Sequence, residues 1–237
     1  MIQKELHTFF SSPIGYLVIA LFVILNGLFL FVFETNFNIL NAGFADLNSF
    51  FYLTPWLFIF LIPAITMRSF SDEIYTGTIE ILKTKPISDL KITLGKYFGA
   101  LLLICIALTP TLIYVFSVYK LGNPVGNIDF ASTLGSYIGI LFLASAFVAI
   151  GLFTSTFSKN QIVAFLTASF ISFIIYYGFE FIANSVSSTN AYQIQNFGMY
   201  AHFQNLSRGL IDTRDIVYFV SITVFFLELT HLRLKRI

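Results

Sequence analysis

The sequence predicts an all-α polytopic membrane protein with six transmembrane helices, and three observations carry that prediction. Hydrophobic residues make up 57% of the 237 residues, charged residues only 11%, and the mean hydropathy is +0.84. Soluble domains carry about 25% charged residues, so this composition lies far outside their range. Six apolar stretches are long enough to cross a bilayer, which takes about 20 helical residues. They cover residues 14–33, 50–67, 97–119, 134–153, 162–182 and 216–234.

The distribution of Lys and Arg predicts the orientation of these spans. If the N-terminus is placed in the cytoplasm, ten of the 13 basic residues face the cytoplasm and three face the other side, namely Lys120, Arg208 and Arg214. Cytoplasmic loops of membrane proteins are enriched in Lys and Arg. Six spans return the chain to the side where it started, so both termini and the polar segment 68–96 are expected in the cytoplasm.

Residues 1–13, which precede the first span, have the pattern of a short interfacial helix. Pro13 is expected to end this helix before the membrane. Lys4, Glu5 and Thr8 lie on other faces than the apolar residues. Those apolar residues recur at helical spacing on one face and are Ile2, Leu6, Phe9 and Phe10.

The segment 68–96, between the second and third spans, contains nine of the 25 charged residues. Ser71 is expected to cap a helix whose first turn holds Asp72 and Glu73. Gly77 interrupts this helix, Pro86 ends it, and Ser88 caps the helix that enters the third span.

We therefore expect a short amphipathic helix lying roughly along the membrane surface. Glu73 and Glu80, seven residues apart, share the face that points to water. The apolar residues that would pack against the membrane domain are Phe70, Ile74, Ile81 and Leu82. The alternative is an ordinary solvated loop with snorkelling lysines.

This segment resembles the coupling segment of ABC-2 type transporter permeases. The resemblance rests on Glu73-Ile-Tyr-Thr-Gly-Thr-Ile-Glu80, followed by Leu82, Pro86 and Gly95-Lys96. The opening Lys4-Glu5…Phe9-Phe10…Ser12-Pro13 is similar to the family's interfacial elbow helix. The run Gly209–Phe219 is similar to the subgroup with gliding-motility and nitrous-oxide-reduction permeases, and the whole chain looks closest to the gliding-motility permease subunit of Bacteroidota.

The resemblance implies one ABC-2 type transmembrane domain over residues 1–237, in the inner membrane of a bacterium, with segment 68–96 docking a separate cytoplasmic ATPase dimer. ATP and magnesium would bind at that partner, and a second permease subunit would complete a homo- or heterodimer in the lipid. Whether an extracytoplasmic accessory subunit joins stays open. The residues expected to couple to the ATPase are Asp72, Glu73, Gly77, Thr78, Glu80 and Leu82, held to the membrane domain by Phe70, Ile74 and Ile81.

Polar residues within the spans are few, and each has a packing and a pathway interpretation. Asn26 is expected to hydrogen-bond to another helix, which favours packing. Asn26 and Thr66 are the polar residues that a substrate route would use instead. Glu180 ends the fifth span and is read as an anchor at the outer interface rather than a proton relay. Glu228 has a local partner in His231, so pairing or snorkelling is favoured over a route.

Several function classes find no support in the sequence. No Gly-x-x-x-x-Gly-Lys-Ser/Thr phosphate loop occurs, so the chain is not expected to be an enzyme that binds ATP in that way. The three histidines and Cys105 are dispersed, so no metal site is expected, and a net charge of +1 offers no face for nucleic acid. The resemblance to ABC-2 permeases implies an exporter. The remaining alternative is a membrane anchor that recruits an ATPase to a motility or secretion machine without transporting a substrate.

Overall fold

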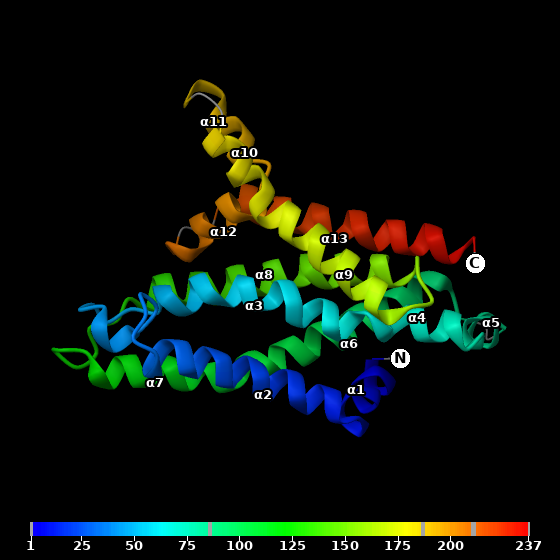
Figure 1. The fold of residues 1–237 in the computed structure, drawn as a ribbon, viewed down its shortest axis with the longest axis horizontal. Coiled ribbons are helices and arrows are strands. Elements are labelled where there is room, and N and C mark those ends of the chain that lie inside the picture. The colour runs from blue at the N-terminus through cyan, green and yellow to red at the C-terminus, as the bar shows by residue number, and fades with distance from the viewer. Residues whose placement is uncertain (1, 85–86, 186–187, 210–211, 237) are drawn as a thin grey trace.

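The computed structural model describes residues 2–84, 87–185, 188–209 and 212–236, and it confirms the predicted fold class (Figure 1). Every regular element in those ranges is helical. Six stretches are long and apolar enough to cross a membrane. They are Gly15–Val32, Asn48–Tyr75, Asp89–Leu121, Phe130–Ser155, Gln161–Ser185 and Thr213–Leu234.

The first half of the chain builds an N-terminal helix, two spans and two short helices. In order these are α1 (Ile2–Ser11), α2 (Pro13–Gly27), the π-helical η1 (Leu28–Val32), the 3-10 turn η2 (Ile39–Asn41), α3 (Asn48–Thr66), α4 (Arg68–Tyr75) and α5 (Thr78–Lys83). The α1 helix confirms the helix predicted before the first span, and the next helix begins at Pro13.

The second half supplies four spans and two helices between the last two of them. These are α6 (Asp89–Leu108), the 3-10 turn η3 (Thr109–Thr111), α7 (Leu112–Leu121), α8 (Phe130–Ser155), α9 (Gln161–Phe173), the π-helical η4 (Ile174–Gly178), α10 (Phe179–Ser185), α11 (Ser188–Gln195), α12 (Met199–Ser207) and α13 (Thr213–Leu234). Ser88 is the N-cap residue of α6, as predicted, although its side chain makes no capping hydrogen bond. Pro86, the predicted helix stop, lies outside the described residues.

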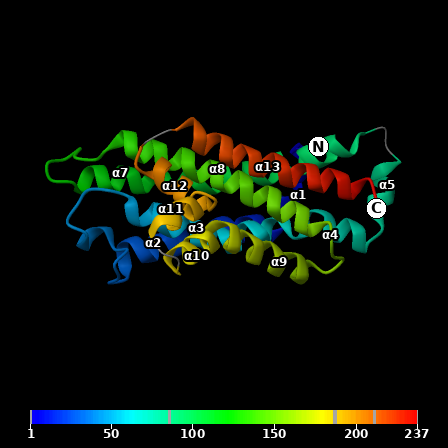
Figure 2. The same ribbon diagram turned by 90° about the horizontal axis from the view of Figure 1, so that it is seen from above.

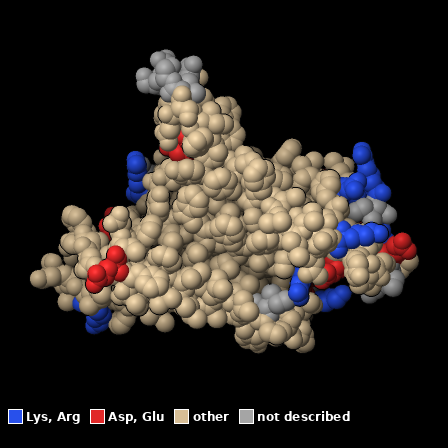
Figure 3. Space-filling view, viewed as in Figure 1, with Lys and Arg blue, Asp and Glu red and all other residues tan. Residues whose placement is uncertain are grey.

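The molecule is elongated, and its two ends differ. Both termini lie at the same end as α1, α4 and α5, which we call the basal end (Figure 1). The distal end carries the loops 33–47 and 122–129 together with α12. Charged side chains gather at these two ends and leave a wide uncharged zone between them (Figure 3). That distribution matches a protein whose middle lies in lipid, where unpaired charges are costly.

The α8 helix is the centre of the bundle, and it packs against α3, α6, α9, α12 and α13 (Figure 2). Gly151 lets α3 approach closely, because a Cβ atom there would lie 2.0 Å from Thr66 Oγ1. The small residues Gly135 and Gly139 likewise contact α12, with Leu206 against both of them. Small residues spaced four apart, such as Gly135 and Gly139, permit close helix packing either within one chain or between two subunits, and here they pack within the chain.

The spacing of Met199, Phe203, Leu206 and Leu210 predicts an amphipathic helix before the last span, and α12 confirms it. Its apolar residues Met199, Phe203 and Leu206 are buried against the bundle, while Leu210, the fourth residue of the pattern, lies outside the described residues. The sequence alone suggests that His202 faces water or headgroups, but its ring is half-buried and stacks on Tyr218 with 3.9 Å between ring centroids.

His202 is held by acceptors on both sides. Its Nδ1 lies 2.6 Å from Asp215 Oδ1 of α13, and its Nε2 lies 2.8 Å from the carbonyl oxygen of Asn196. The contact between His202 and Asp215 fastens α12 to the last span.

Candidate functional site

The polar segment between the second and third spans begins as a continuation of α3. Only Met67 separates α3 from α4, and the two helices follow one direction as a 28-residue stretch (Figures 1 and 2). The prediction that Ser71 caps a helix lying along the membrane surface was therefore wrong. Ser71 is buried within α4, and its hydroxyl donates to the carbonyl oxygen of Met67. The helix continues past Thr66 without changing direction, because no proline or glycine lies between Thr66 and Tyr75.

The chain turns at Gly77, as predicted, and α5 follows. Gly77 has a φ of +71°, a left-handed conformation that glycine adopts without a steric penalty. The turn changes which residues of α5 face the protein. Ile79 is buried, although it would point about 180° away from Phe70 if one helix ran through both. Phe70 is also buried, Ile74 and Leu82 pack half-buried against the core, and the side chain of Ile81 lies outside the described part.

Lys96 of α6 is the centre of a buried charge cluster that joins three helices. Its side chain is 4% exposed. Its ammonium group donates to Glu73 Oε1 of α4 at 2.8 Å and to the carbonyl oxygen of Ser69 at 2.7 Å. It also lies 3.4 Å from Glu5 Oε1 of α1. One cation thus links the N-terminal helix, the polar segment and the third span, because a buried ammonium group must be paired.

Glu73 therefore does not have the position that the heptad spacing predicts. We expected it to present its carboxylate to water beside Glu80, but it turns inward to Lys96. Asp72 is also engaged, since it accepts a hydrogen bond from the side-chain amide of Gln161, the first residue of α9. The same Gln161 accepts from Arg68 Nε at 3.1 Å. A lysine of α5, Lys83, donates to the carbonyl oxygen of Leu234 in the last turn of α13.

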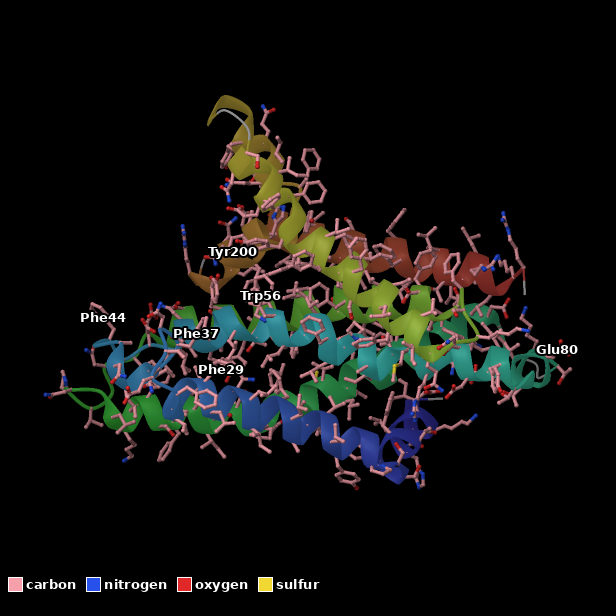
Figure 4. All side chains as sticks on the ribbon, in the orientation of Figure 1. Phe29, Phe37, Phe44, Trp56, Glu80 and Tyr200 are labelled. Atoms are coloured by element: carbon pink, nitrogen blue, oxygen red, sulfur yellow. The ribbon has the colours of Figure 1, made fainter. Side chains whose placement is uncertain are left out.

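The polar segment is consequently bonded to α1, α6, α9 and α13, while its turn stays exposed. We call this turn the α4–α5 corner and define it as Tyr75, Thr76, Gly77, Thr78 and Glu80. Every one of these five residues is exposed, Tyr75 at 73%. Glu80 projects from the basal end (Figure 4). Its carboxylate makes no ion pair with any residue that the structure describes.

A cavity of about 370 Å³ lies beside Lys96, between α1 and the α3–α4 helix. Its lining includes three basic residues (Lys4, Arg68 and Lys96) and three acidic ones (Glu5, Asp72 and Glu73). The charges balance, so the cavity offers no net field that would attract an ion.

The four polar residues assigned to packing or a pathway have local partners. Asn26 is buried, but its amide donates to the Phe22 carbonyl of its own helix at 2.8 Å, not to another helix as expected. Thr66 donates to Ile62 of its own helix and packs on Gly151. Gln195 donates to Glu180 at 3.3 Å, and Glu228 lies 3.3 Å from His231 Nδ1. These contacts favour the packing interpretation of all four.

Two residues of the site were missed by the sequence reasoning. Lys96 was treated only as part of a Gly-Lys pair and as a cytoplasmic charge, although its place about two turns into the helix that starts at Asp89, directly before an apolar run, signals a buried cation that needs partners. Tyr75 was overlooked because it breaks the apolar face of α4. An aromatic residue that lies off the apolar face of its helix, directly before a turn, indicates an exposed residue that can contact a partner.

A family model described as ABC-2 family transporter protein matches residues 1–233. A search of the curated proteins found no match. The family match spans α1, the α4–α5 corner and all six spans.

Proposed function

Because the chain belongs to the ABC-2 family of transporter proteins, we propose that it is the permease subunit of an ATP-driven exporter whose ATPase docks on the α4–α5 corner. In this proposal the ATPase is a separate cytoplasmic dimer that binds ATP and magnesium, and this chain contributes no catalytic group. The basal end faces the cytoplasm, in keeping with the ten-to-three bias of Lys and Arg.

The observation that carries the proposal is the contrast between the exposed corner and its buried support. Tyr75 offers an aromatic ring of the kind that anchors protein interfaces, and Glu80 offers an exposed carboxylate that can complement a basic patch on a partner. Behind them, Asp72, Glu73 and Lys83 bond to other helices. A partner that pushes on the corner would therefore move several spans together as packed elements.

Docking is tested by purifying the permease with its candidate ATPase in detergent and comparing variants. We expect Glu80→Arg and Tyr75→Ala to lose the ATPase while the wild type retains it. Glu34→Arg, at an exposed acid in the distal loop 33–47, is the matched control and should retain it. Retention by both corner variants would place the docking surface elsewhere. Glu73→Arg is not a suitable test, because it would also break the Lys96 cluster.

The proposal includes a second permease subunit. Large apolar side chains cover the outward faces of α2 and α9, among them Leu17, Ile24, Leu166 and Phe170. A bilayer solvates such side chains, and a second six-span subunit would cover part of them. Cross-linking of single cysteines placed on these faces, in a Cys105→Ala background, would reveal a dimer as a doubled mass.

Service in gliding motility is the finer part of the proposal, and it is supported by the likeness of the run Gly209–Phe219 to that subgroup. Deleting the gene in a gliding bacterium that carries it should stop colony spreading, and Glu80→Arg should fail to restore it. The membrane-anchor alternative is favoured instead if the wild-type gene restores spreading and the purified complex hydrolyses ATP, but the complex moves no substrate in vesicles.

A further inference from the structure

A second cavity, of about 580 Å³, opens at the distal end and has no role in ATPase docking. Its walls come from the loop before α3, the first turns of α3, η4 and the C-terminal half of α12. Ligand-binding pockets usually measure about 300–1,000 Å³. Phe37 lies at this end and Trp56 and Tyr200 lie toward the middle of the molecule (Figure 4). The cavity thus sits where the uncharged zone meets the distal charged residues.

The floor of the cavity is aromatic. Phe51, Tyr176 and Phe203 line it and are buried. At its edge the rings of Phe37 and Tyr52 stack, with 5.8 Å between centroids and 27° between planes, and Tyr52 is exposed. These rings form an apolar surface against which the hydrophobic part of a ligand could pack.

The rim of the cavity is polar and carries one sign of charge. Asn36, Asn48 and Gln204 contribute amides, and Arg208, the C-cap residue of α12, contributes a guanidinium group. Arg208 is the one charged residue among those that line the cavity, and no carboxylate lines it. The side chains of Asn36 and Arg208 make no hydrogen bond or ion pair with any residue in the described ranges, so both are free to bind a ligand.

We propose that this distal cavity binds an anionic amphiphile, with its phosphate or carboxylate head on Arg208 and its apolar body on the aromatic floor. The guanidinium group presents planar paired donors that match both head groups. The amides of the rim would bind the polar oxygens next to the head. A resident lipid of the bilayer and an exported amphiphile would both offer this chemistry.

Binding can be followed through Trp56, which is the single tryptophan of the chain and lies 6.4 Å, centroid to centroid, from Tyr176 in the cavity floor. The full chain would be placed in nanodiscs of phosphatidylcholine and titrated with dihexanoyl phosphatidylglycerol. Dihexanoyl phosphatidylcholine, which has the same phosphate but no net charge, is the comparison probe. We expect a saturable change in Trp56 emission with the anionic probe and at least tenfold weaker binding of the zwitterionic one.

Arg208→Gln tests the assignment of the head group. Loss of one charge-assisted hydrogen bond should weaken the anionic probe by about tenfold or more. Arg214→Gln is the matched control, because Arg214 is an exposed arginine of the same end that does not line the cavity, and it should bind as the wild type does. An unsaturable response, equal binding of both probes, or equal effects of the two substitutions would overturn the proposal.

Two nanodisc compositions distinguish the sources of the ligand. If a bilayer lipid occupies the cavity, discs that contain phosphatidylglycerol should show the shifted Trp56 emission already and should not respond to the probe. If the response to the probe persists in those discs, the cavity receives its ligand from outside the resident lipid. The measurement uses the permease without any ATPase, so its outcome is independent of whether docking occurs at the α4–α5 corner.

Discussion

Replacement of Lys96 by methionine should destabilise the protein more than the loss of any exposed lysine. Methionine keeps the length of the apolar stem but removes the ammonium group that bonds Glu73, Ser69 and Glu5. The bonds of 2.8 and 2.7 Å are charge-assisted and contribute about 1.5–3 kcal/mol each, whereas the contact at 3.4 Å contributes little. Breaking a buried ion pair from one side costs about 3–5 kcal/mol, which agrees with that sum.

The assay is the thermal midpoint of the purified protein, read as the fraction that still elutes as a single species after heating. About 3–5 kcal/mol corresponds to a decrease of roughly 6–20 °C for a chain of this size. Lys91→Met, at an exposed lysine of the same helix, is the control and should change the midpoint little. Adding Glu73→Gln to Lys96→Met should recover part of the loss, because it removes the carboxylate left without a cation.

The reasoning would be refuted if Lys96→Met and Lys91→Met had the same midpoint, since the cluster would then contribute no net stability. It would also fail if the double variant were less stable than Lys96→Met alone. In that case Glu73 would be stabilised by groups other than the lysine.

Three further substitutions test the packing described above. Gly151→Leu should abolish the close contact with Thr66 and prevent a stable protein from being purified, because even a Cβ atom would lie 2.0 Å from the Thr66 hydroxyl oxygen. Gly77→Ala should cost about 1–2 kcal/mol, measured as a lower thermal midpoint, because alanine is strained at a φ of +71°. Asp215→Asn should release α12 by removing the carboxylate that contacts His202, and limited proteolysis at the distal end would detect the release as faster cleavage.

The number and type of helices could be predicted from the sequence because the bilayer imposes a length and a composition on each span. Gly77 was also placed correctly, since a left-handed turn favours glycine whatever surrounds it. Both predictions depend on local properties of the chain. The positions of Ser88 at a helix start and of Met199 and Phe203 on a buried face followed from the same kind of local pattern.

The orientation of the charged side chains could not be predicted in this way. Helical spacing placed Glu73 and Glu80 on one face, but the α4–α5 corner separates their helices, and Lys96, 23 residues away from Glu73 in the sequence, turns that carboxylate inward. The partner of Asn26 was also misjudged, because an amide in a helix can bond the carbonyl four residues earlier instead of a neighbouring helix. The partner of a polar side chain depends on which helices are neighbours in the fold, and the residue spacing within one helix does not show which helices those are.

Because α3 continues directly into α4, one long helical segment connects the two ends of the molecule. The 28 residues from Asn48 to Tyr75 form a rod about 42 Å long, at 1.5 Å per residue. One end of this rod carries Phe51 and Tyr52 in the wall of the distal cavity, and the other end carries the α4–α5 corner. A tilt of about 5° around one end displaces the other by about 4 Å over that length. A small displacement of the α4–α5 corner would therefore be transmitted to the wall of the distal cavity.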